Sequence, residues 1–309
     1  MPRKTGASGW SRNEGADSPG RCFGAARSKR GGAMSLFRLI ALAVGLLGLG
    51  FGAARAQQQL DIALILAVDV SGSMDDARYR VQFEGIARAL DDESVIQSLI
   101  GGQRHAMAIA MLAWSDKAEE VMPWRIIASS ADAHRIASLI RSMPRVSGEF
   151  TCLAGMLRQA REGLVRSVPG QASRVIIDVS GDGPDNCSGA HAAEDERDKT
   201  IAEGVTINGL PIRTENEVVG TGAYRAPGFG IEELRNEPHA SGVTIEDWYK
   251  QHVIGGPSAF NIVANGYHDF ERAFRRKFLI EIASGVQGQG QLSMSNANPS
   301  ARAGIIHRN

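Results

Sequence analysis

The chain has 309 residues, with 34 basic and 34 acidic side chains and therefore no net charge at neutral pH. Residues 1–56 hold nine of the basic side chains and two of the acidic ones, so the remainder, with 25 basic and 32 acidic side chains, has a net charge of about −7. This acidic remainder excludes nucleic acid as a ligand, because nucleic-acid-binding proteins present basic surfaces. It is compatible with the binding of cations or of a basic partner.

The N-terminal part of the chain is typical of a leader. Residues 1–33 are rich in Gly, Ser and Arg and have too few large apolar side chains to form a core. Residues 34–56 have the pattern of a secretory signal peptide, with Arg38 before an apolar run and small residues at the end. The run is shorter than the ~20 residues of a membrane span. We therefore expect translation to start at Met34 and a secreted or periplasmic protein from Gln57, without a stable membrane span. An organelle transit segment over 1–33 is the alternative.

Beyond this leader, predicted strands and helices alternate. Strands are expected at 62–68, 105–114, 120–127, 174–179, 205–210 and 260–264. Helices are expected at 78–90, 131–143, 151–168, 190–204, 245–252 and 267–283. The alternation predicts one doubly wound α/β domain over 57–283, with a mostly parallel sheet and helices on both faces. Strand 62–68 should be central, and 120–127 should be an edge strand, where Pro123 is tolerated.

Two stretches depart from this alternation. Residues 211–257 are polar and Gly-rich, with one short helix, and connections of this length are usually lids or binding loops. We expect this insertion to lie over or beside the carboxyl end of the sheet; a disordered surface insertion is the alternative. Residues 284–309 are rich in Gly, Gln, Ser and Asn, which predicts a disordered tail.

The stretch LILAVDVSGSM at 64–74 carries the strongest functional signal. An apolar, partly β-branched run ends in Asp69, then Ser71 and Ser73, and a helical pattern follows at once. Open α/β sheets bind ligands at the carboxyl ends of their strands. Oxygen ligands at alternate positions suit a hard divalent cation such as Mg²⁺. The alternative is that the two serines only cap the helix.

This Asp-x-Ser-x-Ser pattern resembles the metal-ion-dependent adhesion site of von Willebrand factor A domains. That family completes its site with a Thr from a second loop and an Asp from a third. Thr151, in SGEFTCLAGMLRQA, and Asp182, in RVIIDVSGDG, match both in order and context. The resemblance covers 60–283. Within it, DVSGSM, AWSD and SGDGPDN are most similar to a bacterial group of secreted A-domain proteins of uncharacterised function.

The resemblance implies a Rossmann-like fold and a metal site. Ser71, Ser73 and Thr151 would be direct ligands, Asp69 the charged anchor and Asp182 a balancing charge behind them. The ion would be Mg²⁺, with Mn²⁺ or Ca²⁺ as other options. Neutral hydroxyl ligands leave such an ion with an open position, which an Asp or Glu carboxylate of a protein partner would fill. The expected function is therefore metal-dependent protein binding of the adhesion type, not catalysis.

Two cysteines remain after the leader, Cys152 and Cys187. Two cysteines in an exported chain favour a disulfide. Cys152 directly follows Thr151, and Cys187 follows Asp182 by five residues. If both loops meet at one metal ion, as the resemblance implies, the bond would fasten them together. Two separate buried thiols are the alternative.

Two other functions are open. SGDGPDN also resembles the acidic motif of haloacid-dehalogenase-type phosphatases, through Asp182 and Asp185, which would make Asp69 a phosphorylated nucleophile with Mg²⁺ as cofactor. Against this, Ser71 stands where that family has a general acid, and no lysine stands shortly ahead of the motif, although Arg174 could substitute. The other alternative is a structural A domain that keeps the motif but binds no metal.

Overall fold

The computed structural model describes residues 58–189, 191–214 and 243–287. The predicted leader and signal peptide, residues 215–242 of the predicted insertion and residues 288–309 of the predicted tail lie outside these ranges.

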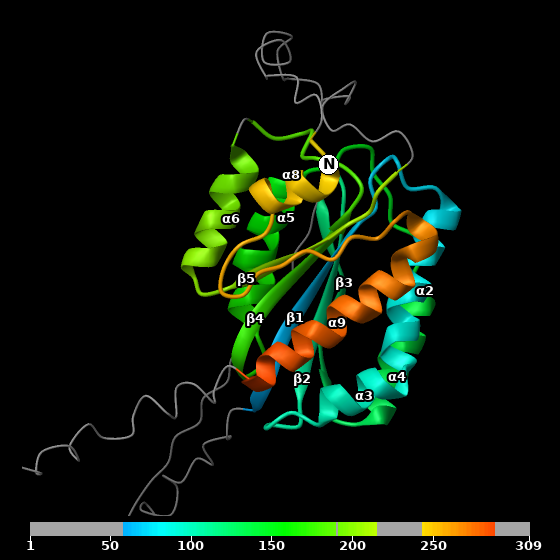
Figure 1. Cartoon of the computed structure of the whole chain (residues 1–309), viewed down its shortest axis with the longest axis vertical. Coiled ribbons are helices and arrows are strands. Elements are labelled where there is room, and N and C mark those ends of the chain that lie inside the picture. Colours follow the sequence, from blue (N-terminus) through cyan, green and yellow to red (C-terminus); the bar gives the residue numbers. More distant parts are fainter. Residues whose placement is uncertain (1–57, 190, 215–242, 288–309) are drawn as a thin grey trace, which may run out of the picture. The chain divides into compact units, whose positions relative to one another are not determined.

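A five-stranded sheet forms the centre of the described part (Figure 1). Its strands are β1 (Gln59–Asp69), β2 (Met107–Trp114), β3 (Ala118–Ile127), β4 (Gln171–Gly181) and β5 (Thr206–Pro211). They lie in the order β3-β2-β1-β4-β5, and all neighbours are parallel except β2 and β3. Strand β1 is central and buried over most of its length, as expected of a continuous apolar run in a parallel sheet. The predicted doubly wound α/β fold is confirmed.

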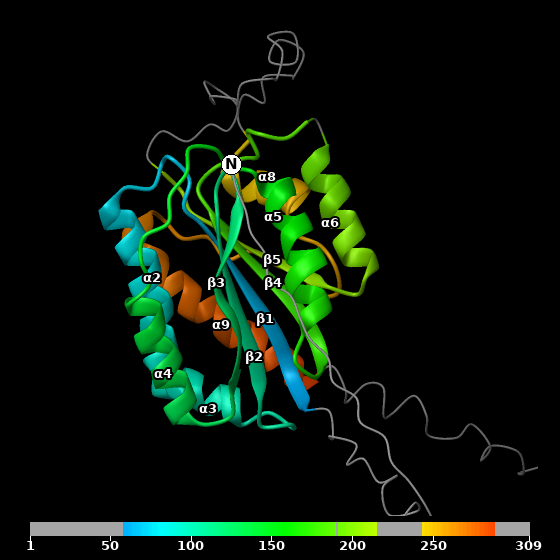
Figure 2. The same ribbon diagram turned by 180° about the vertical axis from the view of Figure 1, so that it is seen from behind.

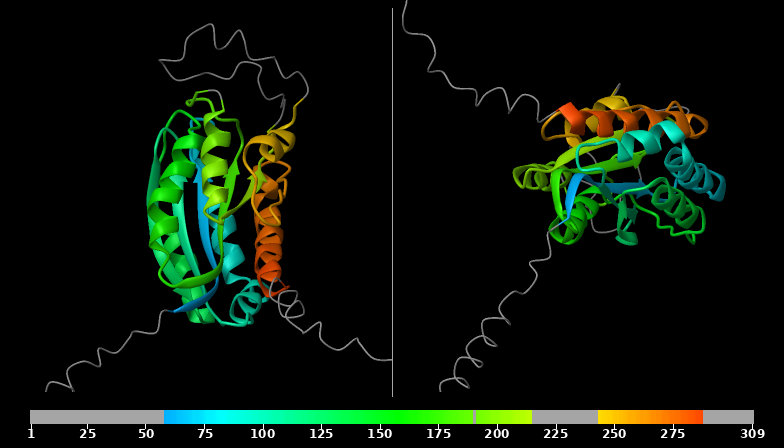
Figure 3. Two further views of the ribbon diagram at one scale, coloured as in Figure 1. Left: turned by 90° about the vertical axis from the view of Figure 1, so that its left-hand side faces the viewer. Right: turned by 90° about the horizontal axis from the view of Figure 1, so that it is seen from below.

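Helices cover both faces of the sheet. Side chains of β1 alternate between two apolar clusters, with Leu64 and Leu66 in one and Ile65 and Ala67 in the other. The first cluster is completed by α2 (Asp76–Asp91), α3 (Glu93–Ile100), α4 (Ser130–Arg141) and α9 (Phe270–Gln287). The second is completed by α5 (Leu153–Gln159), α6 (Ala192–Ala202) and α8 (Ile245–His252). Figures 1 and 2 show α2 and α4 on one side of β1 and α5, α6 and α8 on the other, with α9 crossing β1. Figure 3 shows α9 running along one face. Among the described residues, no helix has the length and apolar character needed to cross a membrane.

Side-chain caps fix where several helices begin. Asp75 accepts a hydrogen bond from the backbone of Arg78 at the start of α2, and Asp92 caps α3 in the same way. Helix α3 was not predicted, because it is short and its apolar residues do not repeat for long enough to stand out. Asp92 also accepts a hydrogen bond from Arg275 of α9 at 2.8 Å, which ties the two helices together.

The structure differs from three of the predicted elements. Residues 260–264 are not a strand, since only Asn261 and Ala264 form isolated bridges to β5 and its extension, and positive φ angles at Gly256 (91°) and Ser258 (59°) interrupt the extended chain before them. The helix predicted at 151–168 is regular only in α5 and continues as a π turn (Ala160–Leu164) and a 3₁₀ turn (Val165–Ser167). Helix α9 extends to Gln287, so the first residues of the predicted tail are helical.

The two edges of the sheet are built differently. The β2–β3 ladder has irregularities around Met111, and β3 carries exposed Glu119, Glu120 and Pro123. The outer edge of β5 is instead paired with the segment 255–264, which exchanges backbone hydrogen bonds with β5 and the residues just after it.

A buried charge cluster joins α9 to the sheet. The Nζ atom of Lys277 lies 2.5 Å from Oδ1 of Asp178 on β4 and 2.6 Å from Oε1 of Glu281. Asn208 of β5 donates to the same Glu281 oxygen at 2.7 Å. All four side chains are buried, so Lys277 supplies one positive charge against two carboxylates away from water. Burial raises the pKa of Asp178 to about 7, and the charge of Lys277 acts against that shift.

Candidate metal centre

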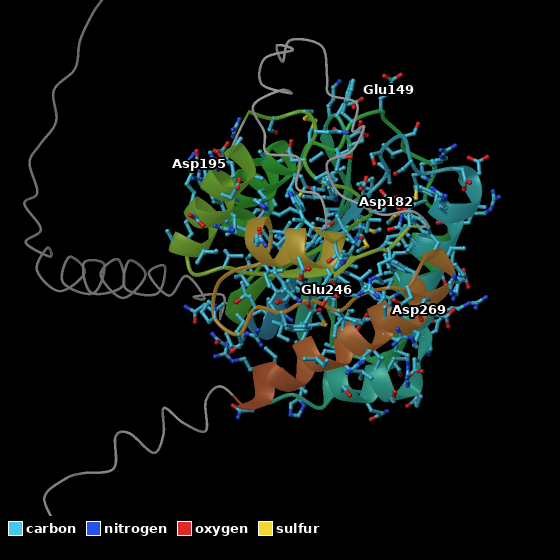
Figure 4. The ribbon with its side chains drawn as sticks, turned by 45° about the horizontal axis from the view of Figure 1, so that its top comes forward. Glu149, Asp182, Asp195, Glu246 and Asp269 are labelled. Atoms are coloured by element: carbon cyan, nitrogen blue, oxygen red, sulfur yellow. A yellow bond between two sulfur atoms is a disulfide. The ribbon has the colours of Figure 1, made fainter. Side chains whose placement is uncertain are left out.

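A hollow of about 400 Å³ lies at the carboxyl ends of β1 and β4. Four of the five predicted site residues line it, namely Ser71, Ser73, Thr151 and Asp182. Figure 4 turns this end of the sheet toward the reader and labels Asp182. The fifth residue, Asp69, is the last residue of β1 and is fully buried. The structure therefore brings together the three loops in which the residues were predicted.

Asp69 is a buried carboxylate that is only half satisfied. Its Oδ1 atom accepts a hydrogen bond from the backbone of Ser71 at 2.8 Å, whereas Oδ2 has no hydrogen-bond partner among the described residues. Burial, and then the negative charge of Asp182, raises the pKa of Asp69 to about 7. A buried carboxylate oxygen without a partner is costly unless a cation or a donor compensates it.

Gly181 lets the chain pass close to Asp69. A Cβ atom at Gly181 would lie 2.9 Å from Asp69 Oδ2 and 2.7 Å from the hydroxyl of Tyr249 in α8. Burial, and then the charge of Asp69, raises the pKa of Tyr249, so this hydroxyl stays protonated beside the carboxylate. Tyr249 lies in the predicted insertion and packs in the interior next to Asp69, although it does not line the hollow.

The two serines are linked to Asp182. The Oγ atoms of Ser71 and Ser73 are 3.4 Å apart, and Ser73 Oγ donates to Oδ1 of Asp182 at 2.8 Å. The other oxygen of Asp182, Oδ2, accepts a hydrogen bond from the hydroxyl of Tyr267 at 2.8 Å. Burial, and then Asp182, raises the pKa of Tyr267, which keeps this donor protonated. Sequence reasoning missed Tyr267, since nothing in its local pattern indicates a site.

The Thr151 loop is fastened to the Asp182 loop by two devices. The backbone N–H of Thr151 donates to Oδ1 of Asn186 at 2.7 Å, and the backbone N–H of Asn186 donates back to the Thr151 carbonyl at 3.0 Å. Next to this pair, Cys152 and Cys187 form a disulfide with their Cα atoms 5.2 Å apart. The position of Thr151 relative to Asp182 is therefore set by covalent and hydrogen-bonded links together.

Two further carboxylates hold the loops from behind. Asp185 accepts from the backbone of Ala154 at 2.9 Å and from that of Ser188 at 2.8 Å, so it supports the start of α5. Asp116 accepts from the backbone N–H groups of Glu149, at 3.1 Å, and of the residue after it. Both carboxylates accept hydrogen bonds from backbone N–H groups, so they stabilise the conformation of these loops.

The donor set fits a hard divalent cation. Among the described residues, no group of three or more His, Cys, Asp or Glu side chains could hold a metal ion. An ion here would instead bind hydroxyl oxygens, with the two carboxylates supplying negative charge nearby, so all the groups around it are oxygen donors. Adjacent ligands of an octahedral Mg²⁺ ion, with bonds of about 2.1 Å, stand about 3 Å apart. The 3.4 Å between the oxygens of Ser71 and Ser73 is close to that spacing.

Two expectations about neighbouring residues have different outcomes. Thr214 lines the hollow, so the first residues of the 211–257 stretch do reach this end of the sheet. Arg174, which the phosphatase alternative needs in place of a lysine, pairs in register with Ile62 near the start of β4 and does not line the hollow. Burial lowers the pKa of Arg174, and the charge of Glu281 acts against that shift. That part of the alternative is wrong.

Several solved structures are similar to this chain. Proximal thread matrix protein 1 from the mussel byssus is 17% identical over 74% of this chain and 48% of that protein, with a TM-score of 0.46. Another structure of the mussel protein has zinc in its MIDAS motif, the metal-ion-dependent adhesion site. A von Willebrand factor type A protein from Catenulispora acidiphila is 14% identical, covering 72% and 43%, with a TM-score of 0.45.

The pilus tip protein Mfa5 of Porphyromonas gingivalis has a von Willebrand domain that is 10% identical, covering 73% of this chain and 96% of that one, with a TM-score of 0.44. The chain spans about half the length of the mussel protein.

No curated protein matches the sequence. The expected resemblance to a group of uncharacterised function is confirmed by a family model that covers most of the chain. A family model described as "Protein of unknown function (DUF1194)" matches residues 59–286, and the chain belongs to this family.

Proposed function

We propose that the protein is an exported binding module that holds a divalent cation at the hollow and recognises a carboxylate of a protein partner through that ion. Ser71, Ser73 and Thr151 would be direct ligands, with Asp69 and Asp182 supplying negative charge beside them. The observation that supports this most strongly is the buried Oδ2 atom of Asp69, which has no hydrogen-bond partner among the described residues. A cation bound next to it would compensate the cost of burying that charge.

The ligand chemistry favours an outside carboxylate. Hydroxyl oxygens are neutral and weak donors, so an ion bound through three of them stays electron-poor and keeps exchangeable positions. Ser73 is exposed at the hollow, and Thr151 opens onto the same space. A carboxylate from a partner Asp or Glu can reach an ion there and complete its ligand shell. Mg²⁺ suits this set best, and Mn²⁺ or Ca²⁺ also accept oxygen ligands.

Export is part of the proposal. The signal-peptide pattern at 34–56 supports it, and so does the disulfide between Cys152 and Cys187, since disulfides persist in oxidising compartments. We favour binding over the phosphatase alternative, because Ser71 replaces the general acid of that family and Arg174 is remote from Asp69.

Thermal unfolding of the full chain tests the metal site. Adding Mg²⁺, Mn²⁺, Ca²⁺ or Zn²⁺ after EDTA treatment should stabilise the wild type by about 2.7 kcal/mol at a hundredfold excess over the dissociation constant. Asp69→Ala should abolish most of this gain, whatever its effect on the metal-free protein. Asp198→Ala, at an exposed position of α6, is the matched control and should respond like the wild type. If no ion raises the melting temperature, the structural, metal-free alternative replaces the proposal.

A further inference from the structure

Arg78 places a positive charge at the rim of the hollow. It lies in the first turn of α2 and lines the same space as Ser71, Ser73 and Thr151. Among the described residues, no carboxylate lies within 4.0 Å of its guanidinium group to form an ion pair. Its charge is therefore available to a ligand that enters the hollow.

The guanidinium group of Arg78 is held in place by two contacts. One of its nitrogens, Nη1, donates to the backbone carbonyl of Ser73 at 2.6 Å. Its central carbon lies 5.1 Å from the centre of the Tyr267 ring, in the geometry of a cation–π contact. Tyr267 is fixed in turn by its hydrogen bond to Asp182. Because the side chain is already ordered, little conformational entropy is lost when it binds a further group.

A carboxylate bound to the ion needs a second partner. A carboxylate has two oxygens, and a ligand that gives one of them to a metal ion leaves the other to accept hydrogen bonds. A guanidinium group has five N–H donors, of which the Ser73 carbonyl occupies one. Charge-assisted bonds of this kind are about twice as strong as neutral ones. Arg78 lines the hollow in which that second oxygen would lie, so its remaining donors are within the same space.

We propose that Arg78 is the residue that makes the site selective for carboxylates, by binding the oxygen that the metal ion leaves free. This inference rests on the proposed function, because it assumes an ion in the hollow. It goes further in naming the group that distinguishes Asp or Glu from Asn, Gln or a hydroxyl as the partner's ligand. An uncharged oxygen could also reach the ion, but it would gain nothing from the charge of Arg78.

Two titrations on the full chain test the inference. The first measures the affinity for Mn²⁺ alone by calorimetry. The second adds to the Mn²⁺-loaded protein a short peptide with an amidated C-terminus and one Asp, and in parallel the same amidated peptide with Asn. Wild-type protein should prefer the Asp peptide. Arg78→Gln should weaken binding of the Asp peptide roughly tenfold to a hundredfold. It should leave Mn²⁺ affinity within about threefold of the wild type.

Two further variants separate charge from position. Arg78→Lys keeps the charge but not the fixed fork of donors, so it should give an intermediate affinity. Arg80→Gln removes an exposed charge two residues along the same helix and should bind both ligands like the wild type.

The outcomes are distinguishable. Wild-type protein that binds no Mn²⁺ overturns the proposed function and this inference with it. If Mn²⁺ binds but Arg78→Gln leaves the affinity for the Asp peptide unchanged, this inference alone is overturned. It is also overturned if Arg78→Gln weakens Mn²⁺ and both peptides equally, because Arg78 would then only support the serine turn.

Discussion

Removal of the disulfide should lower the free energy of unfolding by about 4 kcal/mol. The bond joins residues separated by 35 positions, Cys152 and Cys187. Closing a loop of this length in the unfolded chain costs about 13 cal/mol/K, which is about 3.8 kcal/mol at 25 °C. The double substitution Cys152→Ala/Cys187→Ala removes this constraint from the unfolded state. It leaves the hydrogen bonds between Thr151 and Asn186 in place, so the native loops should keep their arrangement.

Equilibrium unfolding in urea measures the effect directly. The double variant should unfold at lower urea than the oxidised wild type, and the wild type treated with a reductant should match the variant. Metal affinity, measured separately, should fall less than in Asp69→Ala, because the hydrogen-bonded pair still positions Thr151. A loss of stability below about 1 kcal/mol would refute the reasoning, since the unfolded chain would then not be restrained by the bond.

Two further predictions concern the buried charge cluster and the pH dependence of stability. Lys277→Met leaves two buried carboxylates without their cation and should destabilise the protein by about 3–5 kcal/mol. Lys250→Met removes a lysine from an exposed ion pair and should leave the unfolding midpoint in the same urea assay nearly unchanged. Asp92 has its pKa lowered to about 2, first by its hydrogen bond from Arg275. Because this folded-state value is below the unfolded one of about 3.9, the stabilisation is complete above about pH 5 and is lost as the pH falls toward 2. Melting temperatures of Asp92→Asn between pH 5 and 2 should therefore fall less steeply than those of the wild type, and parallel curves would contradict the assignment.

The centre of the fold could be predicted because its signals are local. The run that ends at Asp69 is apolar on both faces of the strand, and the serines follow it directly, so the strand and the turn are visible without tertiary information. Thr151 and Asp182 required the resemblance, since a Thr or an Asp before a glycine is common in ordinary turns. The structure places all of these residues at one end of the sheet, and their role as metal ligands remains a prediction.

The residues that sequence reasoning missed act over long distances along the chain. Tyr267 contacts Asp182 across 85 positions, and the side chain of Asn186 contacts Thr151 across 35. Neither contact produces a periodic pattern in the sequence, because each depends on how α9 and the loops pack. The segment 260–264 was mistaken for a strand because its apolar residues pack beside β5 while its backbone makes only isolated bridges. Local composition does not distinguish a true edge strand from a segment that packs beside the sheet with only isolated bridges.

The construction of the two sheet edges has a consequence for how partners and other copies of the chain can attach. A strand with free backbone groups at an edge is a template for a further strand, and it is also where unfolded or newly exported chains join into aggregates. Here Pro123 lacks an N–H, and the glutamates beside it repel an incoming strand, while β5 is already paired by the segment 255–264. The addition of a further strand is therefore disfavoured at both edges of the sheet. The proposed recognition would therefore use side chains at the loop end of the sheet, where an ion could control it without opening any backbone pairing.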